Sequence, residues 1–138
     1  MILVVDPGDT TGYAFFEEDG QLESKGQADF DTFLGILLAK GYERIVVEDY
    51  RLRAGKQAQQ TGSRFQAVQV IGALKLMAKW DSIPFELASV QAKTLGSMYS
   101  GVKPPSDHKK SHEIDAYNIG IYWLVSQGII DAPALKDL

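Results

Sequence analysis

Two apolar runs that each end in acidic residues constrain the fold of this chain most strongly. Residues 1–6 read MILVVD, and residues 44–49 read RIVVED. A continuous apolar run of this length is typical of a strand that is buried on both faces, as parallel strands covered by helices are. If the two strands lie side by side in parallel, their acidic ends meet at one edge of the sheet. The pattern therefore predicts a sheet with carboxylates gathered at that edge.

The other periodic segments extend this sheet and cover it. Strands are predicted over residues 11–16, 21–27 and 83–87, with the turn signal Glu18-Asp19-Gly20 between the first two. Helices are predicted from Asp29 or Asp31 to about residue 40, from Thr61 or Ser63 to residue 80, and over 90–98 and 111–126, with loops at 50–60 and 99–108. This order predicts an α/β fold: a mixed five-stranded sheet, formed by a three-strand meander plus two parallel strands, flanked by helices.

Size and composition limit the class of protein. The 138 residues suit one domain, 1–138, and the apolar fraction of 45% is enough for a single core. No apolar run approaches the roughly 18 residues of a membrane span, and the start lacks the basic region of a signal peptide, so we expect a cytoplasmic protein. The absence of cysteine excludes disulfides, thiolate zinc sites and a cysteine nucleophile.

The charges are segregated along the chain. The net charge is −4, yet residues 50–111 contain ten Lys or Arg and three acidic residues, giving +7, whereas the remainder carries −11. Such asymmetry indicates binding to a polyanion. The alternative is that solvated helices simply carry lysine.

The long helix predicted over 61–80 is apolar on two sides. One side carries Phe65, Val68, Gly72 and Leu76, and the other carries Ala67, Val70, Ile71, Leu74, Met77 and Ala78. A helix that is apolar nearly all round is buried nearly all round. In so small a domain, the second side can face another copy of the chain, which predicts a homodimer through this helix.

Three carboxylates and a histidine occupy the places where chemistry is expected. Asp6 and Glu48 end the two parallel strands, and Asp115 lies one turn into the last helix with His112 three residues before it. Glu48 is preferred to Asp49 because it shares the inward orientation of Val46. Clustered carboxylates repel unless a cation lies between them, and hard oxygen ligands suit Mg²⁺ or Mn²⁺. Two such ions can activate a water and stabilise a leaving oxygen in phosphodiester hydrolysis.

Other interpretations of these residues stay open. Asp6 can instead cap the Pro7-Gly8 turn, and Asp9 is expected to be a turn residue that bonds its own backbone. Tyr50 and Tyr99 lie in basic, loop-like surroundings where either can stack on bases.

The ordered set of motifs resembles the RuvC family of Holliday junction resolvases, within the RNase H-like superfamily. DPGDTTGY at 6–13 resembles the first-strand motif of that family, and IVVE at 45–48 resembles its second acidic strand. Residues 64–78, 83–86 and 91–93 resemble its long helix, its fifth strand and the basic helix start that follows. HEIDA at 112–116 resembles its last motif.

The resemblance implies an RNase H-like fold, a homodimer on the long helix, and paired nicks in a four-way junction with Mg²⁺ or Mn²⁺. Carried over by position, Asp6, Glu48 and Asp115 become metal ligands, and His112 becomes a ligand or water-orienting group. Compared with typical bacterial members the chain is short, and its basic loop around Lys56 is more similar to phage-encoded members, which places it in a bacterial or phage-infected cell. The aromatic residue that probes the junction in this family has no clear counterpart.

The sequence thus predicts a metal-dependent endonuclease for branched DNA with two metal ions. Phosphate contacts are predicted for Arg51, Arg53, Lys56, Arg64, Lys93, Lys103, Lys109 and Lys110. The alternatives are a flap or single-strand endonuclease, an RNase H, or a catalytically inactive DNA-binding module on the same fold. Residues 6–12 also resemble the first phosphate loop of ATPases and sugar kinases, but those proteins clasp a nucleotide between two domains.

Overall fold

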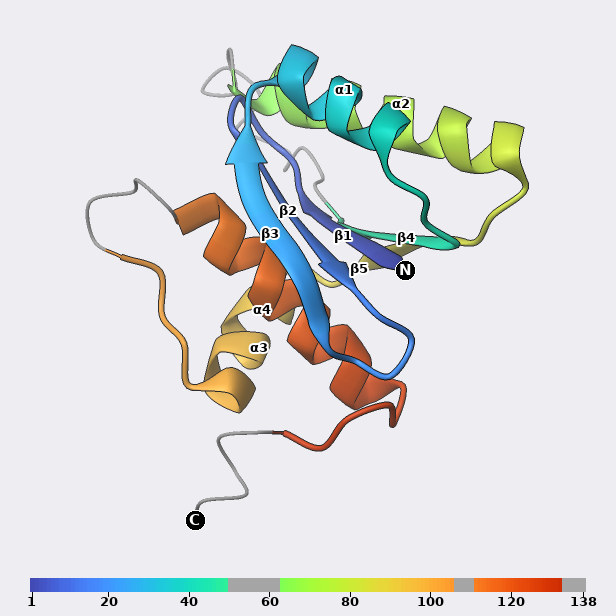
Figure 1. Ribbon diagram of the computed structural model, residues 1–138. Coiled ribbons are helices and arrows are strands. Elements are labelled where there is room, and N and C mark those ends of the chain that lie inside the picture. Colours follow the sequence, from blue (N-terminus) through green and yellow to red (C-terminus); the bar gives the residue numbers. More distant parts are fainter. Residues whose placement is uncertain (50–62, 106–110, 133–138) are drawn as a thin grey trace.

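A computed structural model describes residues 1–49, 63–105 and 111–132 of the chain. Its strands are β1 (Ile2–Asp6), β2 (Thr11–Phe16), β3 (Leu22–Ala28), β4 (Arg44–Glu48) and β5 (Phe85–Ala88). Its helices are α1 (Phe30–Ala39), α2 (Ser63–Asp81), α3 (Ala92–Ser100) and α4 (Ser111–Ser126). The sheet forms the middle layer, with α1 and α2 on one face and α3 and α4 on the other (Figure 1).

The strands form one mixed sheet in the order β3-β2-β1-β4-β5. The first three strands pair antiparallel as a meander, and β4 pairs in parallel with both β1 and β5. The predicted α/β architecture, a three-strand meander plus two parallel strands, is therefore confirmed. The parallel pairing of β1 with β4, from Ile2 opposite Arg44 to Val5 opposite Val47, brings the acidic ends of both strands to one edge.

Two hydrophobic cores fill the space between the sheet and its helices. Because side chains alternate across a strand, even-numbered positions of β1 and β4 face one helical layer and odd-numbered positions face the other. Ile2, Val4 and Val46 pack with Ala116, Ile119 and Leu124 of α4. Leu3, Val5 and Val47 pack with Phe33 of α1 and with Val70 and Leu74 of α2. Asp6 and Glu48 are even-numbered, so they share the face covered by α4.

Local chemistry explains where the elements begin and end. Asp29 is the N-cap of α1, where its carboxylate accepts the Thr32 N–H at 2.8 Å. Gly20 adopts φ 94° in the turn between β2 and β3, as its position in the predicted turn requires.

Two predicted elements have wrong boundaries. The strand predicted over 83–87 begins at Phe85, because Pro84 has no N–H to give to a ladder. The helix predicted over 90–98 ends at Ser100, where Gly101 adopts a left-handed φ of 74°. Tyr99 is therefore helical, and its ring stacks on Tyr122 at 6.5 Å, so it does not lie free in a loop to stack on bases.

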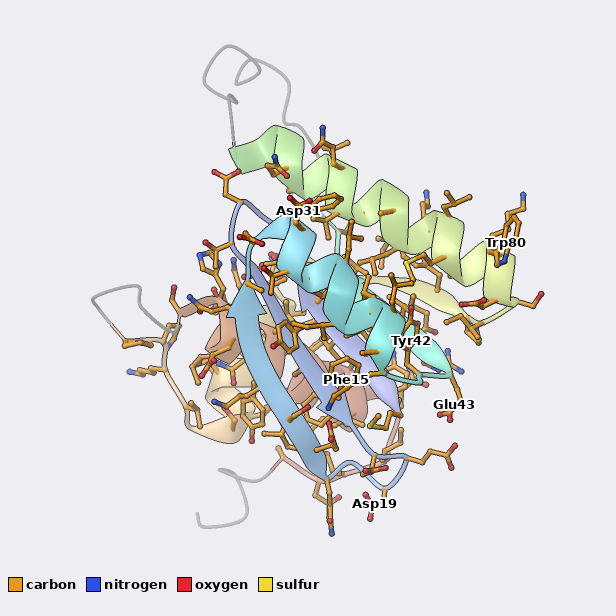
Figure 2. All side chains as sticks on the ribbon, turned by 45° about the horizontal axis from the view of Figure 1, so that its top comes forward. Phe15, Asp19, Asp31, Tyr42, Glu43 and Trp80 are labelled. Carbon is orange, nitrogen blue, oxygen red and sulfur yellow. The ribbon has the colours of Figure 1, made fainter. Side chains whose placement is uncertain are left out.

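The helix α2 buries one of its two apolar sides and exposes the other. Ala67, Val70, Leu74 and Ala78 are buried against the sheet. On the opposite side, Val68, Leu76 and Trp80 are 46%, 66% and 85% exposed. The Trp80 side chain projects from the end of the helix (Figure 2). Across the described segments, no helix combines the length and apolarity that crossing a membrane would require.

Candidate active site

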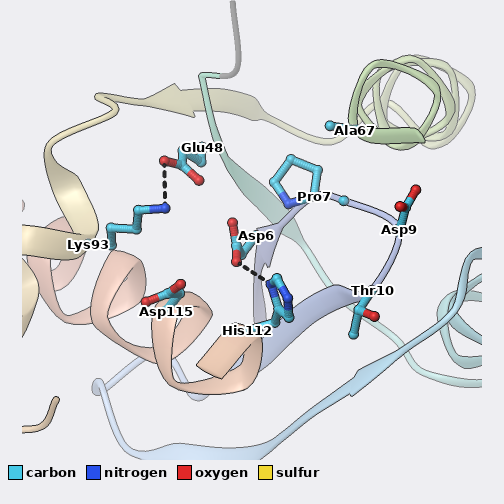
Figure 3. Close-up of a pocket in the computed structure, with 10 residues that line it drawn as sticks. Asp6, Pro7, Asp9, Thr10, Glu48, Ala67, Lys93, His112 and Asp115 are labelled. Atoms are coloured by element: carbon cyan, nitrogen blue, oxygen red, sulfur yellow. Dashed lines mark hydrogen bonds and ion pairs between the residues drawn. The ribbon is translucent and has the colours of Figure 1, made fainter. Parts of the chain in front are cut away.

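A pocket with a volume of about 400 Å³ opens at the edge of the sheet where β1 and β4 end. Its lining residues are Asp6, Pro7, Gly8, Asp9, Thr10, Glu48, Ala67, Lys93, His112 and Asp115. All four residues predicted to be catalytic or metal-binding are in this set, and they come from β1, β4 and α4 (Figure 3). The fold therefore brings together side chains that are up to 109 positions apart in the sequence.

The ends of two strands place the first two carboxylates. Asp6 and Glu48 are 5% and 4% exposed, each at the last position of its strand. Glu48 is opposite Ala88 of β5, so it lies inside the sheet and not at its border. Asp49 is less buried than Glu48, which agrees with the orientation that the sequence pattern predicts.

The first turns of α4 place the third carboxylate and the histidine. Ala116, which follows Asp115, is fully buried in the core below the helix, as the small residue at this position predicts. His112 Nδ1 lies 3.3 Å from the Asp6 carboxylate, so the helix and β1 meet directly in the pocket. A role for Asp6 that is limited to capping the Pro7-Gly8 turn would leave this contact with His112 unexplained.

A lysine completes the group. Lys93 lies in the first turn of α3, and its Nζ is 3.6 Å from Glu48 Oε1 (Figure 3). The sequence predicts a phosphate contact for Lys93 but not this ion pair. The pairing depends on how α3 packs beside the sheet, and no local pattern reports that.

The electrostatics of the pocket are dominated by crowded negative charge. Burial, followed by the neighbouring Asp6 carboxylate, raises the pKa of Glu48 to about 8, although Lys93 acts in the opposite direction. Burial and the charge of Asp6 also raise the pKa of Asp115, while Lys93 and His112 oppose the shift. The carboxylates therefore lie where a proton or a cation is needed to relieve their repulsion.

The same carboxylates raise the pKa values of the two basic groups in the pocket, Lys93 and His112. Burial disfavours the charge on Lys93, but attraction to Glu48, Asp6 and Asp115 outweighs it and raises the pKa of the ammonium. The interaction with Asp6 raises the pKa of His112 against the opposing effects of burial and of Lys93. The acids that each basic group faces thus favour its charged form.

The donor set fits a hard divalent cation. Carboxylate oxygens are the ligands that Mg²⁺ and Mn²⁺ prefer. A cation beside Asp6 and Glu48 would offset the repulsion between these two carboxylates, which contributes to the raised pKa of Glu48. Among residues 1–49, 63–105 and 111–132, no three acidic or histidine side chains converge tightly enough to form a complete cage for one ion. Mg²⁺ commonly binds through one or two carboxylates, with waters and substrate phosphates as its other ligands. The residues therefore fit that ion without such a cage.

The predicted phosphate contacts are only partly visible. Lys93 lines the pocket, and Lys103 is exposed beyond the end of α3. Arg64 belongs to the first turn of α2. Arg51, Arg53, Lys56, Lys109 and Lys110, together with Tyr50, lie outside the described residues.

The pocket also contains residues that the sequence did not mark for it. Pro7, Gly8 and Thr10 line it, and so does Asp9, which the sequence marks as a turn residue. Their signal is present in the sequence, because the turn directly after a buried strand that ends in an acid has to border any site at that strand end.

The sheet order, the helices on both faces and the acids at the end of β1 and β4 define an RNase H-like α/β fold. Comparisons with known proteins support this class from structure and not from sequence, since no family model and no curated protein matches the chain. Among solved structures, the chain is similar to RuvC of T. thermophilus in complex with Holliday junction substrate. The TM-score is 0.62 and the identity 14%, over 93% of this chain and 96% of that one. The chain therefore has the fold of RuvC.

Proposed function

We propose that the protein is a metal-dependent, structure-selective endonuclease that cleaves branched DNA such as Holliday junctions. The observation that carries the proposal is the convergence of Asp6, Glu48, Asp115, His112 and Lys93 on one pocket. The pocket lies at the end of the parallel strands, where this class of sheet places its sites. The fold is shared with a RuvC whose structure was solved with a Holliday junction. We infer that the chain acts in the cytoplasm of a bacterial or phage-infected cell.

The three carboxylates and the histidine that converge on the pocket each have a chemical role in this proposal. Asp6, Glu48 and Asp115 would hold two Mg²⁺ or Mn²⁺ ions, with His112 as a further ligand or as the group that orients the attacking water. Divalent ions at such a site supply a nucleophile at neutral pH and stabilise the leaving oxygen of a phosphodiester. Because metal binding by imidazole needs its neutral form, the Asp6 contact that favours protonation of His112 makes this residue sensitive to pH.

Lys93 has a separate role beside the carboxylates. Its ammonium pairs with Glu48 and lines the pocket, so it can neutralise a phosphate that enters there. The other cations, Arg51, Arg53, Lys56, Arg64, Lys103, Lys109 and Lys110, would contact phosphates farther along the DNA. Contacts of this kind position a nucleic acid without reading its sequence.

The exposed side of α2 suggests how the protein would assemble. Val68, Gly72, Leu76 and Trp80 follow one another at four-residue spacing, and a side chain added at Gly72 would meet open space. We propose that this stripe packs against a second copy, because two sites in one dimer can nick the two strands of a symmetric junction.

A cleavage assay on a panel of labelled substrates tests the proposal. The panel contains a four-way junction, a 5′ flap, a single strand, a plain duplex and an RNA–DNA hybrid, each with Mg²⁺, with Mn²⁺ and with EDTA. We expect symmetric nicks in the junction that disappear in EDTA. Cleavage confined to flaps, single strands or hybrids would assign another nuclease activity to the same pocket. Binding without cleavage on every substrate would identify a DNA-binding module.

A further inference from the structure

A row of three residues crosses the sheet directly beneath the first turn of α4. Gly12 of β2 is the register partner of Asp6 on β1 and of Gln27 on β3. Register partners on neighbouring strands point to the same face of a sheet. The row Gln27-Gly12-Asp6 therefore faces α4 as one surface, with the smallest residue in its middle.

The first turn of α4 contacts every member of this row. His112 Nδ1 faces the Asp6 carboxylate at 3.3 Å, and the Glu113 N–H donates to Gln27 Oε1 at 3.3 Å. Beside the row, Lys25 of β3 pairs with the Glu113 carboxylate at 2.9 Å. Contacts on both sides of Gly12 thus hold the helix down on the sheet.

Gly12 has no space for a side chain. A Cβ built there would lie 1.9 Å from the His112 carbonyl oxygen, 2.3 Å from its carbonyl carbon and 3.0 Å from the Glu113 nitrogen. All three atoms belong to the backbone of α4, so no rotation of a side chain can relieve the clash. Gly12 lies in a regular strand and is absent from the positive-φ positions, so the requirement for glycine is steric and not conformational.

We propose that Gly12 is a positioning residue: its missing side chain, with Gln27 beside it, sets how closely His112 and Asp115 approach Asp6. The consequence for catalysis rests on the proposed function. A shift of the helix by even the width of a methyl group would move two of the four predicted ligands together relative to Asp6. Misplacement by about 1 Å at a reacting centre costs roughly 100-fold in rate.

The variant Gly12→Ala tests this, with Gly120→Ala as its matched control. Gly120 lies on the same helix and faces the same strand, and a Cβ there would lie 2.2 Å from the Phe16 ring. Both variants overpack the contact between α4 and β2, but Gly120 lies five residues, about one and a half turns, beyond Asp115. Gln27→Ala is the second test variant, because it removes the acceptor of the Glu113 N–H without adding bulk.

Three measurements are made on each folded variant: thermal stability, hydrogen exchange of the Glu113 amide, and Mn²⁺ affinity by calorimetry. For Gly12→Ala we expect Glu113 exchange to become roughly tenfold faster or more. We expect its Mn²⁺ affinity to fall about 10–100-fold, as for residues that orient metal ligands. Gly120→Ala should lower the melting temperature while leaving both other quantities near wild type. Gln27→Ala should change them in the direction of Gly12→Ala, and it decides the matter if Gly12→Ala does not fold.

Equal effects of Gly12→Ala and Gly120→Ala on Mn²⁺ affinity would overturn the inference, since a general loss of packing would then explain both. Unchanged exchange of Glu113 in Gly12→Ala would also overturn it. If the wild-type protein binds no Mn²⁺, the proposed function is wrong. The exchange rates of the Glu113 amide then still decide whether Gly12 sets the position of α4 on the sheet.

Discussion

Glu48 is a buried carboxylate that lies beside a second buried carboxylate, Asp6. Lys93 of α3, 3.6 Å from Glu48, and His112 of α4, 3.3 Å from Asp6, offset part of their combined charge. Burial and Asp6 raise the pKa of Glu48 from 4.5 to about 8, so the folded protein holds a proton there that the unfolded chain releases. The contribution of Glu48 to folding is therefore favourable below about pH 4.5 and is lost as the pH rises toward 8.

The variant Glu48→Gln should remove this dependence in EDTA. The amide keeps the shape of the side chain but carries no charge, so its stability relative to wild type should increase between pH 5 and pH 9. The difference should reach on the order of a few kcal/mol, since one pKa unit corresponds to about 1.4 kcal/mol. Thermal melts across this range measure it, with the exposed Glu18→Gln as control. Parallel curves for Glu48→Gln and wild type would contradict the assigned burial cost.

At the residue scale, the sequence predicted which acids lie together but not which residues they contact. The alternation in RIVVED distinguishes Glu48 from Asp49 because burial follows strand parity. The Lys93–Glu48 ion pair and the contact of Gly12 with His112 were not predicted, since each joins segments whose separation depends on helix packing. The stacking of Tyr99 on Tyr122 was missed for the same reason.

Among the elements, α2 differs most from an ordinary surface helix. The apolar residues on its side facing the sheet are buried, yet Leu76 and Trp80 on the other side are more than half exposed. Packing this exposed stripe against an apolar partner would be favourable, because burying one large apolar side chain stabilises a complex by about 1.5–3 kcal/mol.

The proposed dimer predicts that Leu76→Glu dissociates the protein. A buried, unpaired carboxylate at the interface is strongly unfavourable, so the dimer dissociation constant should rise by roughly 100-fold or more. Sedimentation velocity over a range of concentrations measures this. Met98→Glu is the control, because Met98 is similarly exposed, at 65%, but lies on α3 across the sheet. A wild-type protein that sediments as a monomer at every concentration would refute the dimer.

The boundaries of elements were less predictable than their existence. The apolar segments together with the turn and cap signals identified every strand and helix of the described segments, but β5 and α3 begin two residues later than predicted. Single residues decide such ends: Pro84 delays β5, and Gly101 terminates α3. Pro84 and Gly101 are visible in the sequence. Where each element begins or ends also depends on which backbone groups find hydrogen-bond partners in the folded protein.

For the molecule as a whole, a mixed sheet made of a meander plus two parallel strands followed from the sequence because few topologies satisfy it. Two apolar strands needed cover on both faces, and three segments with short turns could pair as a meander. RuvC of T. thermophilus shares this fold at 14% identity, so the same arrangement of strands and helices forms from largely different residues. The relative placement of α3 and α4, and with it the detailed pocket, could not be derived from patterning alone.

The segregated charge predicts salt-dependent binding to DNA. If the eight cations proposed as phosphate contacts, Lys103 among them, bind the DNA, the affinity for a junction should fall steeply with salt, with a slope of about 0.9 in log–log form for each contact. Lys103→Ala should lower that slope by about 1. Lys79→Ala should not change it, because Lys79 lies twelve residues along α2 from Ala67 of the pocket, roughly 18 Å away. Equal effects of the two substitutions, or a flat salt dependence, would contradict the assignment of the binding face.

The central claim, that the pocket of Asp6, Glu48 and Asp115 cuts branched DNA, is tested most directly by Asp6→Asn on a labelled four-way junction in Mg²⁺. Asp49→Asn is the matched control, with the same loss of charge next to Glu48 on the adjoining, less buried position. The account predicts that Asp6→Asn lowers cleavage about a thousandfold while junction binding is retained, since the ion contributes several kcal/mol to the transition state. Asp49→Asn should cleave like wild type. Cleavage by Asp6→Asn at the wild-type rate would contradict the account.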